Sequence, residues 1–136
     1  MHLKKGYKQL LAEAAGRITT LSAAQAREIY DTPDTVFVDL RDPRELEREG
    51  MIPGALHAPR GMLEFWVDPE SPYYREIFGA GKRLVFYCQS GWRSALACAT
   101  LEDMGLPRVA HIDGGYRAWK AAGLPTGPKP ERPKHA

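Results

Sequence analysis

Cysteine, net charge and long apolar runs are all scarce in this sequence, and each shortage excludes a class of protein. Two cysteines among 136 residues are too few for the disulfide framework of a small secreted domain. The formal net charge is +2, whereas nucleic-acid-binding domains carry a pronounced basic patch. No apolar run approaches the roughly 18 residues that cross a bilayer. We therefore expect neither a nucleic-acid nor a membrane partner.

Targeting and metal signals are also missing. The first residues contain two lysines but no apolar stretch behind them, so we predict no secretory signal and a cytosolic protein. The four histidines show no ligand spacing with cysteines or carboxylates, and we expect no metal and no other bound cofactor. Gly114-Gly115 is not part of an extended glycine-rich pattern. We therefore interpret it as a tight turn before the last helix rather than a phosphate-binding loop.

Apolar strands alternate with helical segments along the chain. The spacing predicts helices at 3–16, 23–30, 41–49, 60–66, 93–104 and 116–121, and strands at 18–20, 35–40, 55–58, 82–87 and 109–112. This alternation favours a parallel α/β sheet with helices on both faces. We divide the chain into an N-terminal helical extension (1–17), one domain (18–125) and a disordered, proline-rich tail (126–136).

One loop combines the features of a reactive cysteine. It joins the predicted strand 82–87 to the helix at 93–104 and has the sequence Cys88-Gln89-Ser90-Gly91-Trp92-Arg93-Ser94. A free thiol is only a few per cent ionised at neutral pH, but a helix N-terminus and nearby cations lower its pKa. Arg93 supplies such a cation, and Gly91 permits a turn whose amides face inward. We therefore predict that Cys88 is a thiolate in a cradle suited to a persulfide or an oxyanion.

Three segments in the same order resemble the rhodanese family. They are CQSGWRS, VFVDLRDPRELEREGMIPGALHAPRG and DGGYRAWKAAGLP, spread from about residue 36 to residue 125. The resemblance implies a five-stranded parallel sheet flanked by helices. It also implies that Cys88 accepts sulfur from thiosulfate or a related donor, and that the amides of residues 89–94 hold the terminal sulfur. The persulfide would then pass its sulfur to cyanide, a small thiol or a protein thiol, as covalent catalysis with ping-pong kinetics.

The first of these segments departs from the family pattern at one position. The family usually has histidine before Ile-Pro-Gly-Ala, and this chain has Met51. We expect the change to affect packing rather than chemistry.

Three charged residues after the strand at 35–40 have two interpretations each. Asp39 is either an organiser beneath the cysteine loop or a residue that pairs locally. Arg41 and Arg44 either attract an anionic donor at the rim of the pocket or belong to an ordinary charged surface. We include all three among the candidate substrate-binding residues, with residues 89–94.

Trp92 and Cys98 also allow alternatives. Trp92 shapes access for an acceptor or packs on the surface near Tyr116. Cys98 is a small buried residue of the helix or a resolving thiol. The distance along the helix from Cys88, some 10 Å or more, is too long for a disulfide.

Two other functions compete with sulfur transfer. The helix at 3–16 and Trp92 favour an interaction module that delivers or senses sulfur in a larger assembly. Arg93 keeps a phosphatase or arsenate reductase open as a third hypothesis. The active-site loops of those enzymes follow a longer pattern, with five residues between cysteine and arginine. In this chain four residues separate Cys88 from Arg93.

Overall fold

The computed structural model describes residues 1–130. In chain order the elements are α1 (Tyr7–Ala15), β1 (Thr19–Leu21), α2 (Ala23–Ile29), β2 (Thr35–Asp39), α3 (Pro43–Glu49), β3 (Leu56–His57), the 3₁₀ helix η1 (Arg60–Met62), α4 (Leu63–Val67), the 3₁₀ helix η2 (Glu76–Gly79), β4 (Arg83–Tyr87), α5 (Trp92–Met104), β5 (Val109–Ile112) and α6 (Gly115–Ala121). Within this part of the chain, no helix is long and apolar enough to span a bilayer.

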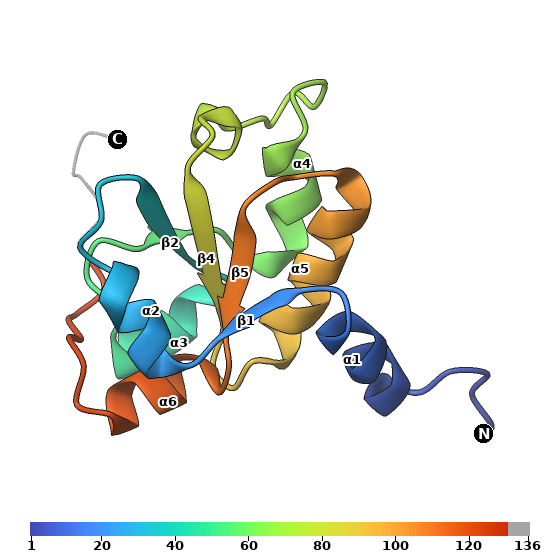
Figure 1. Ribbon diagram of the computed structural model, residues 1–136, viewed down its shortest axis with the longest axis horizontal. Coiled ribbons are helices and arrows are strands. Elements are labelled where there is room, and N and C mark those ends of the chain that lie inside the picture. Colours follow the sequence, from blue (N-terminus) through green and yellow to red (C-terminus); the bar gives the residue numbers. More distant parts are fainter. Residues whose placement is uncertain (131–136) are drawn as a thin grey trace.

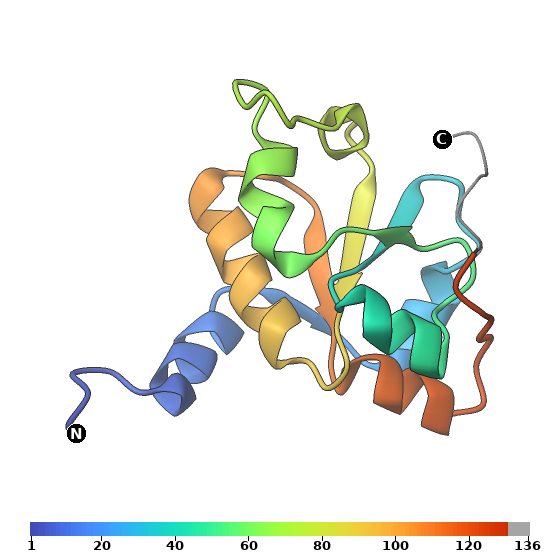
Figure 2. The same ribbon diagram turned by 180° about the vertical axis from the view of Figure 1, so that it is seen from behind.

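The five strands form one parallel sheet with helices on both of its faces (Figures 1 and 2). The strand order is β1-β5-β4-β2-β3, and all four strand pairs are parallel. Helices α1, α4 and α5 lie on one face, and α2, α3 and α6 lie on the other. The predicted five-stranded parallel α/β fold is therefore confirmed.

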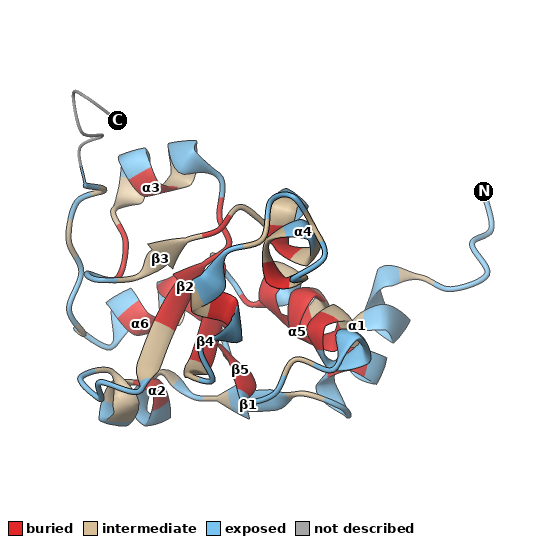
Figure 3. Cartoon of the chain, turned by 90° about the horizontal axis from the view of Figure 1, so that it is seen from above, coloured by how far each residue is buried: buried red, intermediate tan, exposed pale blue. Residues whose placement is uncertain are grey.

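The central strands are buried on both faces because successive side chains of a strand point to opposite sides. Val38 and Phe86 join a core cluster with residues of α4 and α5. Their neighbours Phe37 and Val85 join a second cluster that includes Trp119 of α6. Figure 3 shows buried residues concentrated in the central strands and in α5. Such near-continuous apolar runs are typical of parallel sheets.

Local signals set the starts of α2 and α3. Ser22 accepts a hydrogen bond from the amide of Gln25, whose side chain accepts from the Ser22 amide in turn. Asp42 and Glu45 form the same capping box at α3, with Pro43 in its first turn. The Ser22 cap agrees with the sequence prediction, whereas the charged segment predicted as helix from residue 41 begins at Pro43.

The N- and C-terminal segments differ from the sequence-based expectation. The predicted helix at 3–16 begins only at Tyr7. Gly127 forms a backbone bridge with Met51, with N–O distances of 2.8 and 2.9 Å, and the indole of Trp119 donates to the carbonyl of Pro125 at 2.7 Å. These contacts hold the start of the predicted tail against the domain, and residues 131–136 lie outside the described residues.

Candidate active site

The cysteine loop (residues 88–94) follows β4 at the edge of the sheet where the parallel strands end, the usual place for a site in α/β folds. The first turn of α6 fixes its backbone. The amide of Tyr116 donates to the carbonyl of Cys88 at 2.8 Å, and the amide of Arg117 donates to the carbonyl of Gln89 at 3.1 Å. These are amides at the start of a helix, which lack partners inside it. The segment DGGYRAW therefore holds the loop in place.

The sulfur of Cys88 lies against amides of its own loop. It accepts hydrogen bonds from the amide of Gly91 at 3.1 Å and from the amide of Ser94 at 3.4 Å. The hydroxyl oxygen of Ser94 is 3.6 Å away. Gly91 has φ +105°, a conformation that glycine adopts without the penalty a Cβ brings. Cys88 is 1% exposed, so the sulfur is held within the loop rather than displayed on the surface.

Arg93, the cation that the sequence placed in the loop, is paired with a carboxylate of α3. Its guanidinium binds both carboxylate oxygens of Glu45, at 2.8 and 2.9 Å. The hydrogen bonds from Arg93 lower the pKa of Glu45 below its ordinary value, so the carboxylate stays charged at neutral pH. The positive charge of Arg93 is thus largely balanced by the carboxylate of Glu45, a residue of α3.

Asp39 and Arg41 form a fully buried ion pair rather than a pocket rim. The Arg41 Nη2 to Asp39 Oδ2 distance is 2.8 Å, and both side chains are 0% exposed. The guanidinium also lies 4.2 Å from the centre of the Tyr116 ring and donates to the side-chain oxygen of Gln89 at 3.2 Å. Arg41 is expected from the sequence to be either a rim residue or part of a charged surface, and its buried position matches neither description, because the guanidinium is paired with these groups. Asp39 pairs locally, and through Arg41 it reaches the cysteine loop.

The other predicted substrate-binding residues are spread around the loop. Arg44 is exposed on α3, and Ser90 is exposed at the tip of the loop. Trp92 is 57% exposed. Its ring contacts that of Tyr7 of α1 in a tilted arrangement, with 5.1 Å between the centroids, and does not pack on Tyr116, which is buried.

Cys98 has the surroundings of a packed core residue. Its sulfur lies 3.6 Å from the carbonyl oxygen of Ala110, and burial raises the pKa of its thiol to about 12. It belongs to the core cluster between the sheet and α5. Met51, which replaces the histidine usual in the family, is likewise buried.

His111 is a site neighbour that the sequence reasoning missed. Its Nδ1 is 2.9 Å from the hydroxyl oxygen of Ser94, and its Nε2 is 3.2 Å from the hydroxyl oxygen of Thr20. The side chain is 5% exposed, and burial lowers the pKa of its imidazole. A polar residue near the carboxyl end of a buried strand, next to the strand that carries Cys88, was the available signal.

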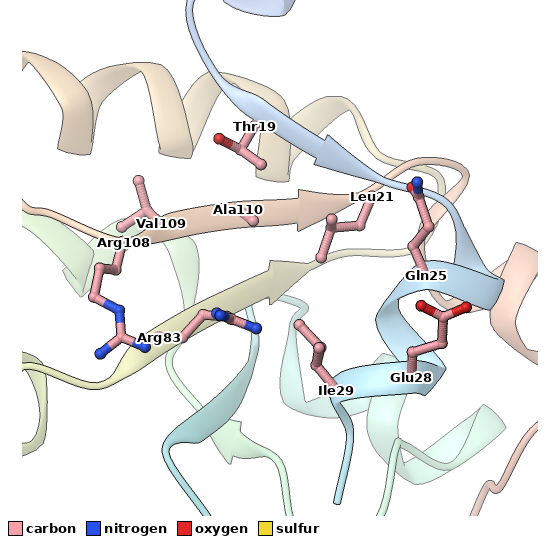
Figure 4. A pocket seen from close by; sticks show the side chains of 9 residues that line it. All are labelled: Thr19, Leu21, Gln25, Glu28, Ile29, Arg83, Arg108, Val109 and Ala110. Atoms are coloured by element: carbon pink, nitrogen blue, oxygen red, sulfur yellow. The ribbon is translucent and has the colours of Figure 1, made fainter. Parts of the chain in front are cut away.

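Two surface hollows differ in their relation to the loop. One of about 510 Å³ lies between α2 and the β1, β4 and β5 strands, is lined by residues such as Arg83 and Arg108 and includes no residue of the loop (Figure 4). The other, of about 270 Å³, runs beside the loop and α1; Thr20, Trp92 and His111 are among its lining residues. We call the second the α1 groove. Among residues 1–130, no cluster of three or more His, Cys, Asp or Glu side chains could hold a metal.

Known proteins with similar sequences or structures agree with this architecture. Residues 22–122 match the family described as rhodanese-like domain. A protein named sulfurtransferase from Allochromatium vinosum is 38% identical over 104 residues, which are 76% of this chain and 89% of that protein. A tRNA uridine(34) hydroxylase of Salmonella newport is 36% identical over 109 residues, which are 77% of this chain but only 30% of the hydroxylase.

A solved structure from Rhodopseudomonas palustris has a TM-score of 0.90 and 51% identity, and covers 93% of this chain and 98% of its own. It is described as a protein of unknown function, possible tyrosine phosphatase. The sulfurtransferase relative supports a transferase activity for this fold. The match over residues 22–122, three quarters of the sequence, settles the family. The chain belongs to the rhodanese-like domain family.

Proposed function

We propose that this protein is a sulfurtransferase that moves a sulfane sulfur through a persulfide on Cys88. The Cys88 thiolate attacks the outer sulfur of thiosulfate, a new S–S bond forms, and sulfite leaves with the electrons of the broken bond. Cyanide or a thiolate then attacks the outer sulfur of the persulfide and takes it as thiocyanate or as a new persulfide. The Cys88 thiolate is the leaving group of this second step and returns to its starting state.

The observation that carries the proposal is the pair of amides directed at the sulfur of Cys88. Gly91 and Ser94 donate to it at 3.1 and 3.4 Å. Amide donors stabilise an anionic sulfur better than a neutral one, because hydrogen bonds to a charged acceptor are roughly twice as strong. A cysteine that served only to fill the core would have no use for such donors. The sulfurtransferase from Allochromatium vinosum supports the same assignment.

The segment DGGYRAWKAAGLP contributes to the mechanism by positioning the cysteine loop. The amides of Tyr116 and Arg117 bind the carbonyls of Cys88 and Gln89, so the peptides next to the sulfur are fixed in orientation. A preorganised loop need not reorganise its dipoles during the reaction.

Steady-state kinetics test the proposal. Thiocyanate production should follow ping-pong kinetics when thiosulfate and cyanide are varied, and it should be lost in Cys88→Ala. Cys98→Ala is the matched control, because the thiol of Cys98 is buried and stays protonated. Intersecting rather than parallel double-reciprocal lines, or equal loss in both variants, would contradict the proposal.

A phosphatase is the second candidate, since the similar Rhodopseudomonas palustris structure is described as a possible tyrosine phosphatase. Two features disfavour it. Four residues rather than five separate Cys88 from Arg93, and the Arg93 guanidinium binds Glu45. We expect no hydrolysis of p-nitrophenyl phosphate that depends on Cys88. Hydrolysis lost in Cys88→Ser would overturn the preference.

We also propose a protein thiol as one acceptor. Trp92 of the cysteine loop and Tyr7 of α1 form an exposed aromatic pair, a surface that a small anion such as cyanide does not need. With reduced thioredoxin as the probe, Trp92→Ala should raise the KM for the protein acceptor and leave the KM for cyanide unchanged. Equal changes for both acceptors would show that Trp92 acts on the conformation of the loop and would contradict a role in docking a protein acceptor.

A further inference from the structure

The buried sulfur of Cys88 and the protein surface are joined by a chain of hydrogen-bonding side chains. Cys88 Sγ lies 3.6 Å from Ser94 Oγ, Ser94 Oγ lies 2.9 Å from His111 Nδ1, and His111 Nε2 lies 3.2 Å from Thr20 Oγ1. Cys88 follows β4 directly, and the other three residues come from α5, β5 and β1. Cys88, Ser94 and His111 are buried, whereas Thr20 is exposed. Both Thr20 and His111 line the α1 groove.

We propose that Ser94, His111 and Thr20 are positioning residues that form a proton relay between Cys88 and the α1 groove, with one tautomer of His111 for each protonation state of the sulfur. The proposal rests on the proposed function in one respect, since a nucleophilic Cys88 is what gives the relay a purpose. The amides of Gly91 and Ser94 stabilise a thiolate, but an amide gives up no proton and provides no exit for one. A sulfur that is 1% exposed needs such an exit.

Each protonation state of Cys88 is matched by one arrangement of the hydrogen bonds among Ser94, His111 and Thr20. When Cys88 is a thiol, the Ser94 hydroxyl donates to Nδ1 of His111, and the Nε2–H donates to Thr20. When Cys88 is a thiolate, the Ser94 hydroxyl donates to the sulfur, Nδ1–H donates to Ser94 Oγ, and the Thr20 hydroxyl donates to Nε2. Because a neutral imidazole has one donor and one acceptor, only one of these arrangements exists at a time.

The step between the two states balances in protons. The S–H proton passes to Ser94, the Ser94 proton to Nδ1, the Nε2 proton to Thr20, and the Thr20 proton to water in the groove. No bond between heavy atoms changes, and the imidazole is neutral before and after. The carbonyl of Gly91, 3.3 Å from Ser94 Oγ, is the competing acceptor for the hydroxyl proton, but it cannot pass a proton onward.

The surroundings keep His111 neutral, as the relay requires. Burial lowers the pKa of its imidazole, and Asp113 near the end of β5 opposes this shift. From α5 the ring meets Ser94, beyond which lies the sulfur of Cys88, and from β1 it meets the uncharged Thr20. Asp113 is thus the charged group of the described residues that acts on the ring.

The tautomer of His111 is the most specific test. Long-range ¹H–¹⁵N spectra of the labelled protein identify which ring nitrogen is protonated. In wild type, at a pH where Cys88 reacts fully with iodoacetamide, we expect Nδ1 to carry the proton. In Cys88→Ala we expect Nε2 to carry it, because Ser94 then has no sulfur to donate to. The same tautomer in both proteins would overturn the relay.

The pH dependence of Cys88 alkylation is the second test. His111→Leu removes both ring nitrogens, so Ser94 loses the Nδ1–H donor that leaves its own hydroxyl free to bind the thiolate, and the proton loses its path to the groove. Alkylation at pH 7 should slow about tenfold. In His111→Asn the side-chain amide can donate to Ser94 but, like the backbone amides, passes no proton onward. The relay therefore predicts slowing as in His111→Leu, and a rate close to wild type would show that a hydrogen-bond donor suffices and would contradict the relay. If His111→Leu does not fold, Thr20→Val supplies the surface variant, with a smaller shift in the same direction.

Superimposable alkylation profiles for wild type and His111→Leu would contradict the relay. If His111→Leu does not fold, superimposable profiles for wild type and Thr20→Val would do the same. Both tests are independent of sulfur transfer, because they need no sulfur donor or acceptor. A protein that forms no persulfide but shows the tautomer switch would refute the proposed function and retain the relay. A protein that forms the persulfide without the switch would do the reverse.

Discussion

The amide of Tyr116 donates a hydrogen bond of 2.8 Å to the carbonyl oxygen of Cys88, which joins the start of the last helix to the residue that carries the sulfur. The two residues are far apart in the sequence, yet they belong to two of the three segments that resemble the family. The contact gives a physical reason why both segments are needed. One segment supplies the thiol, and the other fixes the direction of the peptide that follows it.

Gly115 makes this contact possible, so Gly115→Ala should disrupt the site. The residue has φ +59°, and a Cβ there would lie 2.8 Å from the carbonyl carbon of Gln89 and closer still to the carbonyl oxygen of Cys88. We expect a loss of at least about 2 kcal/mol in the free energy of unfolding and a fall in Cys88 alkylation. Gly61→Ala is the control, because a Cβ at Gly61 meets no atom within 4 Å. Equal stability of the two variants in urea denaturation would contradict this explanation.

Release of Arg93 from Glu45 should strengthen binding of an anionic sulfur donor. Glu45→Gln keeps the side-chain oxygen that caps α3 but removes the carboxylate that binds Arg93. We expect the KM for thiosulfate to fall roughly two- to fivefold at low ionic strength, and the effect to vanish at high salt. Glu47→Gln, on the exposed side of the same helix, should leave the KM unchanged. A KM that rises in Glu45→Gln would show that the ion pair itself shapes the donor site.

The buried Asp39–Arg41 pair should be far more important for stability than the exposed Arg44. Asp39→Asn leaves a buried guanidinium without its counter-charge, which typically costs about 3–5 kcal/mol. Arg44→Ala should change the free energy of unfolding by less than about 0.5 kcal/mol, because only the backbone amide of Arg44 is bonded at the cap of α3. Chemical denaturation measures both. A small cost in Asp39→Asn would mean that Tyr116 and Gln89 suffice to hold Arg41.

The sequence predicted the parts of this architecture that depend on local patterns. The apolar runs at 35–40 and 82–87 became the central strands, and Ser22 caps the helix that follows it. A strand that is buried on both faces is encoded by a short and nearly continuous run of apolar residues, which is visible directly in the sequence. The position of Cys88 between such a strand and a helix was visible for the same reason.

The contacts that sequence reasoning missed join residues distant along the chain. Arg41 follows a strand and resembles a solvated charge until Tyr116, from the far end of the chain, covers it. The partner of Trp92 is Tyr7 rather than Tyr116, which depends on how α1 packs on α5. The bridge between Met51 and Gly127 uses backbone atoms alone, so no pattern of side chains in the sequence indicates it.

Burial of His111 should make folding sensitive to mild acid. Its pKa is lowered in the folded state, whereas in the unfolded chain it is about 6.5. Between these two values the unfolded chain binds more protons, so stability rises with pH through this window and falls as the pH drops below about 6.5. The contribution is at most about 1.4 kcal/mol per pH unit. In His111→Asn, denaturation curves between pH 5 and 7 should show a shallower dependence; an unchanged slope would assign it to other groups.

The mass of the intact protein after incubation with thiosulfate tests the central claim most directly. The account predicts that wild type and Cys98→Ala each gain one sulfur atom, that cyanide removes it, and that Cys88→Ala gains none. A wild-type protein that gains no sulfur, although iodoacetamide labels Cys88 to completion in the same sample, would contradict it.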